Sequence, residues 1–89
     1  MAAAPEDAVR QRDAERTRTE ILDEATAEFA DRGLAGARVD EIAARTRTTK
    51  RMLYYYFGSK QGLYLAVLER AYTGIRALEQ QLSVSDLNP

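Results

Sequence analysis

Apolar side chains in the last third of the chain recur every three or four positions, which is the spacing of one face of an α-helix. The series is Tyr64, Leu68, Ala71, Ile75, Leu78 and Leu82. Side chains of a β-strand alternate at every second position, so this period excludes a strand. It predicts one long helix over residues 61–82. We find no strand signal and no internal repeat in the 89 residues, so the sequence predicts an all-α fold.

Three shorter helical segments precede this long one. The first covers residues 13–32, with an apolar stripe of Ile21, Leu22, Ala25, Phe29 and Ala30. Acidic residues fill its other face: Glu20, Asp23, Glu24 and Glu28. Gly33 is expected to end it, because glycine readily adopts positive φ. Segments 39–46 and 50–56 predict two short helices joined by a turn at Arg47-Thr48.

The short helices carry their own packing and capping residues. Val39, Ile42 and Ala43 form the expected buried face of the first, and Leu53 and Phe57 anchor the second. A hydroxyl in the Thr48-Thr49 pair can cap the second helix. We therefore expect a flexible arm over residues 1–12, a three-helix domain over 13–60, a connecting helix over 61–82 and a tail over 83–89.

The composition removes several function classes. The chain has no cysteine and no histidine, which excludes thiolate chemistry and imidazole bases and ligands. Its acidic residues are expected on outward helix faces, so we expect no enzyme, no metal and no cofactor. The N-terminus lacks the basic start and apolar core of a signal peptide. The longest apolar run, Met52 to Phe57, is too short to span a membrane, so a cytoplasmic location without membrane contact is expected.

Charge is distributed unevenly along the chain, although the net charge is only −1. Residues 1–33 carry a net −4, residues 34–60 a net +4 and residues 61–89 a net −1. From Arg45 to Lys60 there are five basic residues and no acidic one. Because the local field steers a polyanion, this stretch favours a nucleic-acid partner despite the total charge.

Two short helices joined by a turn and preceded by a packing helix match the layout of a helix-turn-helix. In this layout the second helix presents its first residues to base edges, and its flanks hold phosphates. The candidate DNA-binding residues are Arg38, Thr48, Thr49, Lys50, Arg51, Tyr54, Tyr55, Tyr56 and Lys60. Tyr54 and Tyr55 point about 100° apart on a helix, so one of them should lie at the DNA surface.

Three motifs carry a resemblance to a known family. The run from Thr17 to Gly33 (TRTEILDEATAEFADRG) resembles the first helix of TetR-type bacterial repressors. The run from Val39 to Ala43 (VDEIA) resembles their second helix. The run from Leu53 to Lys60 (LYYYFGSK), followed by Leu63, is similar to their recognition-helix signature. The resemblance covers roughly residues 14–70.

The resemblance implies a homeodomain-like three-helix reading head that binds double-stranded operator DNA in the bacterial nucleoid. It further implies a transcription regulator, by default a repressor, that forms a homodimer through a C-terminal effector-binding domain absent from this chain. The sequence departs from the family pattern at Arg38, Arg47, Thr48, Arg51 and Tyr56. These departures leave base preference open: Arg51 can pair with guanine or lie along a phosphate.

A second function remains open from the sequence. The apolar stripe of residues 61–82 continues beyond what three short helices could cover, so it could bind a partner helix. In that case the chain would be a helical protein-interaction module. It would then assemble without DNA and be indifferent to Lys50 and Arg51.

Overall fold

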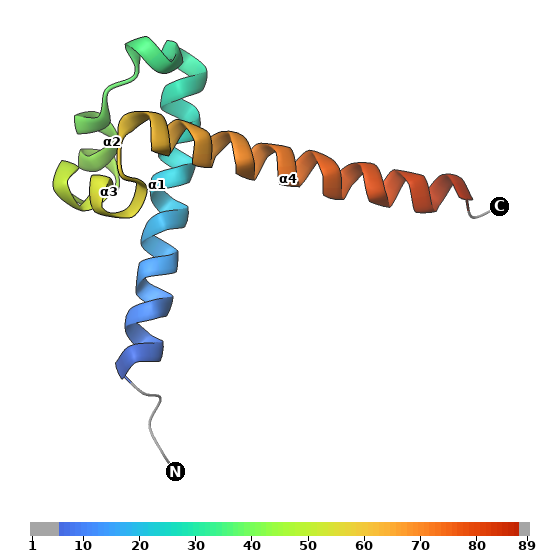
Figure 1. The fold of residues 1–89 in the computed structure, drawn as a ribbon, viewed down its shortest axis with the longest axis horizontal. Helices are drawn as coiled ribbons and strands as arrows, with labels where there is room; N and C mark the ends of the chain where they lie inside the picture. Colours follow the sequence, from blue (N-terminus) through green and yellow to red (C-terminus); the bar gives the residue numbers. More distant parts are fainter. Residues whose placement is uncertain (1–5, 88–89) are drawn as a thin grey trace.

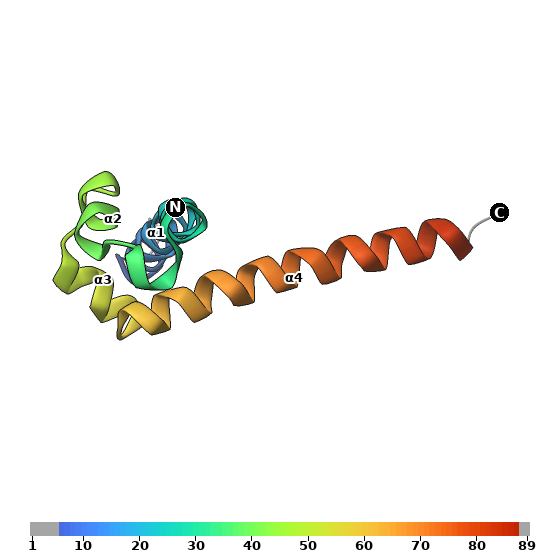
Figure 2. The ribbon, with the colours of Figure 1, turned by 90° about the horizontal axis from the view of Figure 1, so that it is seen from above.

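The computed structural model describes the backbone of residues 6–87 and the side chains of residues 9–83. This range contains four helices and no strand: α1 (Glu6–Gly36), α2 (Val39–Arg45), α3 (Lys50–Phe57) and α4 (Lys60–Leu87). In Figure 1, α2 and α3 lie together beside α1, and α4 extends away from them as a single rod. Figure 2 shows the same arrangement from above. The predicted all-α fold, with a long fourth helix, is confirmed.

The two outer helices are longer than the sequence predicts. Residues 6–12, expected as an arm, form the start of α1, and residues 83–87, expected as tail, continue α4. Neither segment contains glycine or proline, and adding residues to an existing helix costs little free energy. The apolar pattern therefore does not mark where a helix begins or ends. The rest of the expected arm and tail lies outside the described residues.

Gly33 breaks α1 near its end, as predicted. Its backbone has φ 70° and ψ 175°, which is not helical, and a short final turn follows. The Ala37 amide donates to the Gly33 carbonyl oxygen at 3.0 Å. This break turns the chain from α1 toward the start of α2.

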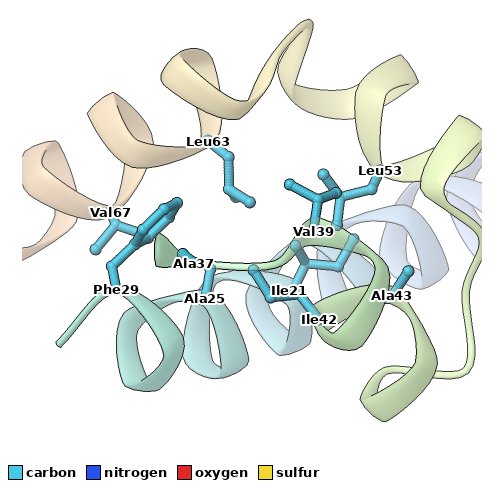
Figure 3. Packing of buried hydrophobic residues seen from close by; sticks show 10 residues of the cluster. All are labelled: Ile21, Ala25, Phe29, Ala37, Val39, Ile42, Ala43, Leu53, Leu63 and Val67. Carbon is cyan, nitrogen blue, oxygen red and sulfur yellow. The ribbon is translucent and has the colours of Figure 1, made fainter. Parts of the chain in front are cut away.

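One apolar cluster holds the four helices together (Figure 3). It consists of Ile21, Ala25, Phe29, Ala37, Val39, Ile42, Ala43, Leu53, Leu63 and Val67. Two predictions about the first helix are wrong: Ala30 is exposed, and Glu28 is buried with 2% of its surface accessible. Glu28 lies seven residues after Ile21, two helical turns along the same face. Phe57 is only partly buried, at the edge of the cluster.

The turn between α2 and α3 is a Schellman motif. The Thr48 amide donates to the Ala43 carbonyl at 3.0 Å, and the Arg47 amide donates to the Ala44 carbonyl at 3.3 Å. Arg47 occupies the left-handed position, with φ 55°, where glycine is the usual residue. The Thr49 hydroxyl accepts a hydrogen bond from the Met52 amide at 3.1 Å, so the predicted cap of α3 is confirmed.

The connection between α3 and α4 is equally tight. Gly58 has φ 83° and ends α3, and its amide donates to the Tyr54 carbonyl at 2.7 Å. The Ser59 hydroxyl then accepts from the Gly62 amide at 2.9 Å and caps α4. A methyl group added at Gly62 would overlap the carbonyl oxygen of Phe57. The helix junction therefore depends on a position without a side chain.

Polar and aromatic contacts fix the direction of α4 against α1. The Arg70 guanidinium donates to Asp23 at 2.8 Å and to the Thr26 hydroxyl at 3.0 Å. The rings of Phe29 and Tyr64 meet edge to face, with centroids 5.0 Å apart. These contacts lie near the start of α4, and every side chain from residue 71 to residue 83 is exposed.

Candidate nucleic-acid interface

The lysines that begin α3 and α4 both reach the region where the chain passes from α1 to α2. The Lys50 ammonium at the start of α3 is 3.7 Å from the carboxylate of Asp40 in the first turn of α2. The Lys60 ammonium at the start of α4 donates to the Ala35 carbonyl, in the last turn of α1, at 3.3 Å. The fold therefore brings both predicted lysines to the N-terminal end of α2.

The outward face of α3 is formed by two side chains. Leu53 points into the core and is fully buried. Arg51 and Tyr55 lie four residues apart on the opposite face, and Tyr55 is 79% exposed. Within the described part of the chain, the Arg51 guanidinium makes no hydrogen bond, ion pair or ring contact. Both side chains are therefore available to a partner that approaches α3 from outside.

The other predicted residues of α3 lie beside this face and are partly engaged. The Lys50 ammonium sits 5.9 Å from the centre of the Tyr54 ring. Tyr54 and Tyr56 are half-buried and pack against the core cluster. The rings of Tyr55 and Tyr56 are 5.6 Å apart and nearly perpendicular. Of the pair that the sequence left open, Tyr55 is the one that faces outward.

The remaining predicted residues lie at the margins of α3. Arg38 is exposed immediately before α2, and Thr48 is half-buried in the turn. Thr49 is exposed and serves as the cap of α3. Lys60 is half-buried at the start of α4, with its ammonium directed at the segment before α2. Arg38 and the Lys60 ammonium thus lie near the passage from α1 to α2, and Thr48 and Thr49 lie between the end of α2 and the first turn of α3.

Glu28 of α1, which the sequence predicts on the solvent face, is a buried carboxylate bonded to residues at both ends of α2. Glu28 accepts a hydrogen bond from the Arg38 amide at 2.9 Å and another from the Arg45 guanidinium at 3.1 Å. Arg45 also reaches Glu41 at 3.4 Å, and Arg32 lies 3.5 Å from Glu28. The Arg45 charge is therefore paired with two carboxylates of the protein, although it belongs to the basic stretch.

The sequence contained a signal for the buried position of Glu28. Ile21, Ala25 and Glu28 follow each other at spacings of four and three, which is the period of the buried stripe. An acidic residue on such a stripe needs partners, because an unpaired charge is costly to bury. The partners were not readable, since Arg38 and Arg45 lie ten and seventeen residues further along the chain.

Glu28 is expected to make stability depend on acid pH. The hydrogen bond from the Arg38 amide, with help from Arg45 and Arg32 and against the effect of burial, lowers the pKa of Glu28 from its ordinary 4.5. Its ionised form thus stabilises the fold at neutral pH, and this contribution is lost as pH falls below 4.5 and through the lowered value.

Urea unfolding of the wild type and of Glu28→Gln at a series of pH values tests this expectation. The variant should be less stable at neutral pH, and the difference should narrow as the pH falls below 4.5. Glu20→Gln, an exposed position on the same helix, is the matched control and should follow the wild type at every pH. A constant difference for Glu28→Gln would show that the charge plays no part.

Within residues 6–87 no group of three or more acidic side chains is arranged to hold a metal ion. None of the described helices is long and apolar enough to cross a membrane.

Two short helices joined by a Schellman turn, with the second one exposed and the first one packed on a longer helix, constitute a helix-turn-helix domain. Residues 21–67 match the family of bacterial regulatory proteins known as the tetR family. The match covers more than half of the chain, and the chain belongs to this family.

Individual relatives agree with this assignment. The chain is 38% identical over 81 residues to the HTH-type transcriptional repressor NicS of Pseudomonas putida, covering 91% of this chain and 38% of that protein. It is 49% identical over 59 residues to the HTH-type transcriptional repressor SCO4008 of Streptomyces coelicolor, covering 66% of this chain and 31% of the relative. The chain thus spans about a third of the length of these relatives.

A solved structure shows the same fold. The crystal structure of a putative transcriptional regulator, SCO4942 from Streptomyces coelicolor, superposes with a TM-score of 0.67 at 49% sequence identity. The superposition covers 68% of this chain and 34% of the other. The similarity therefore concerns the helix-turn-helix part of a larger protein.

Proposed function

We propose that this chain binds double-stranded operator DNA sequence-specifically, as the reading head of a transcription regulator. In this proposal α3 lies in the major groove, where an α-helix fits and the base edges are distinguishable. The observation that carries it is the outward face of α3, on which Arg51 and Tyr55 are exposed next to Lys50. The relatives NicS and SCO4008 are named as regulators rather than as enzymes, which supports the same reading.

The residues around α3 are proposed to hold the DNA backbone. Arg38, just before α2, and Lys60, at the start of α4, supply positive charge. Hydroxyls of the turn and of the tyrosines can donate hydrogen bonds to phosphate oxygens. These hydroxyl residues are Thr48, Thr49, Tyr54 and Tyr56. Such contacts fix the register of α3 on the duplex and carry no sequence information themselves.

The sign of regulation and the assembly are also proposals. Two relatives are named as repressors, which favours repression by this protein. We further infer that the intact protein acts as a homodimer on chromosomal DNA in the cytoplasm, because operator half-sites are commonly read by two-fold pairs of such domains. An effector would regulate binding by changing the spacing of the two reading heads.

The second function left open by the sequence, protein interaction through α4, has one observation in its favour. The apolar stripe of α4 is exposed, with 46% of Leu68, 55% of Ile75 and 57% of Leu82 accessible. A continuous exposed apolar stripe is typical of a contact surface. Sedimentation of the chain without DNA separates the two functions. Assembly that is unaffected by changes at Lys50 and Arg51, together with no DNA binding, would favour the interaction module.

The variant Lys60→Ala tests the proposed phosphate contacts. We expect weaker binding to all duplexes alike, with the slope of log K against log salt reduced by about one, because one phosphate neutralisation is lost. Fluorescence anisotropy with several unrelated duplexes at a series of salt concentrations measures both quantities.

Arg76→Ala is the control for this variant. Arg76 is exposed on the distant part of α4, where its guanidinium lies 5.6 Å from the centre of the Tyr72 ring. Arg76→Ala removes the same formal charge as Lys60→Ala, but from a position outside the proposed interface. The affinity and salt slope of Arg76→Ala should therefore equal those of the wild type. If Lys60→Ala changed the preferred sequence and left the salt slope intact, the phosphate role of Lys60 would be wrong.

A further inference from the structure

We propose that the operator half-site contains a guanine read by Arg51 and, about two base pairs away, a thymine whose methyl group packs against Tyr55. This inference rests on the proposed function and goes beyond it, because it names the base chemistry that α3 recognises. It starts from the outward face of α3, which these two side chains share.

The spacing of the two side chains matches the spacing of base pairs. Arg51 and Tyr55 lie one helical turn apart, and four residues at 1.5 Å each separate them by about 6 Å along α3. Successive base pairs are stacked about 3.4 Å apart. A helix that follows the groove therefore places the two side chains about two base-pair steps from each other.

Arg51, rather than Lys50, is suited to read a base. The Lys50 ammonium is 3.7 Å from Asp40 and lies against the Tyr54 ring, so it is held to one side of α3. The Arg51 guanidinium has no partner among the described residues. Its planar fork matches the O6 and N7 acceptors that guanine alone presents in the major groove.

A base contact fits the position of Arg51 better than a phosphate contact. The groups suited to phosphates lie at the margins, with Arg38 before α2 and Lys60 at the start of α4. Arg51 lies in the first turn of α3 and points directly away from the buried Leu53. A side chain in the middle of the outward face meets the floor of the groove, and the phosphates lie along the groove walls.

Tyr55 presents an apolar ring in the same direction. It is 79% exposed, and its edge-to-face contact with Tyr56 limits where the ring can go. Apolar surface on a recognition helix recognises thymine, since the thymine methyl group is the one apolar group that a base offers in the major groove. The pair therefore predicts a half-site that contains both a guanine and a thymine.

Selection from a random-sequence duplex pool is the first experiment, using the whole chain and three variants. The wild type should enrich a site with an invariant guanine. Arg51→Ala should lose the guanine, and Tyr55→Ala should lose the thymine two steps away. Lys50→Ala is the charge-matched comparison: it should bind every duplex more weakly and still enrich the guanine. Circular dichroism confirms that each variant is folded, because all three side chains are exposed.

Modified bases then test the two contacts atom by atom. Replacing the selected guanine with 7-deazaguanine removes the N7 acceptor, and replacing the thymine with deoxyuridine removes the methyl group. The 7-deazaguanine replacement should weaken wild-type binding roughly tenfold, and the deoxyuridine replacement should weaken it less. Arg51→Ala should no longer respond to 7-deazaguanine, and Tyr55→Ala should no longer respond to deoxyuridine.

The outcomes separate this inference from the proposed function. An enriched site without guanine, or binding to the pool without enrichment, would overturn the inference and leave DNA binding intact. A uniform loss of affinity and a smaller salt slope for Arg51→Ala would also overturn it, since Arg51 would then contact a phosphate. No binding to any duplex by the folded chain would overturn both.

Discussion

Gly62→Ala is expected to lower the free energy of unfolding by about 3 kcal/mol or more, because the new methyl group would overlap a backbone atom. The overlap is with the carbonyl oxygen of Phe57, where α3 ends against the first turn of α4. A backbone carbonyl cannot rotate out of the way as a side chain can. The α3–α4 junction must therefore open, and thermal unfolding should show a midpoint lowered by roughly 15 °C.

Gly74→Ala is the matched control for this prediction. Both glycines lie in α4, and a methyl group at Gly74 meets no atom within 4 Å. Alanine is the better helix former by about 1 kcal/mol, so Gly74→Ala should raise the unfolding midpoint. Helix propensity alone would predict the same gain at Gly62. A stabilised Gly62→Ala would therefore contradict the close approach between α3 and α4.

Leu53→Ala is expected to cost about 2–5 kcal/mol, the range for removing a large aliphatic side chain from a packed core. Leu53 is fully buried and is the side chain of α3 that enters the core cluster most deeply. A domain of this length has a total stability of only about 4–13 kcal/mol. The variant should therefore lose a large share of the stability of the domain, and urea unfolding monitored by circular dichroism measures the loss.

Met52→Ala, one position earlier on α3, is the control for Leu53→Ala. It makes a similar truncation on the same helix without removing a buried side chain. Met52 is 41% exposed, so its truncation should change the unfolding free energy far less than that of Leu53. Equal losses for the two variants would mean that α3 is not held by Leu53. The comparison also matters for function, because loss of the Leu53 contact frees α3 from the cluster that orients Arg51 and Tyr55.

Much of the fold could be predicted from local patterns. The stripe of α4, the glycine break at Gly33 and the cap at Thr49 each depend on residues a few positions apart, and each is found in the structure. The helix ends at residues 6 and 87 could not be predicted in this way, because the sequence of the added turns carries no apolar stripe at helical spacing. Apolar spacing thus predicts that a helix forms, and it does not predict the residue at which that helix begins or ends.

The sequence predicts which residues are candidates for the site, but it does not predict which of them are exposed or what they contact. The residues of α3 follow from the helix-turn-helix layout, but their exposure depends on the position of Leu53 relative to the core. The contact of Lys60 with the Ala35 carbonyl joins positions 25 residues apart, and no local rule predicts it. The burial of Glu28 is a similar case, because its partners come from α2 and from the residue before it. Long-range polar contacts thus decide which charges remain available to DNA.

We propose that this chain binds DNA through a phosphate-contacting surface around α3. The most direct test of this claim is fluorescence anisotropy of the chain with a random-sequence duplex, titrated from about 20 to 200 mM salt. We expect binding that weakens steeply with salt, with a slope of about −0.9 for each phosphate neutralised. A chain that is folded by circular dichroism and yet shows no binding at the lowest salt would contradict the claim.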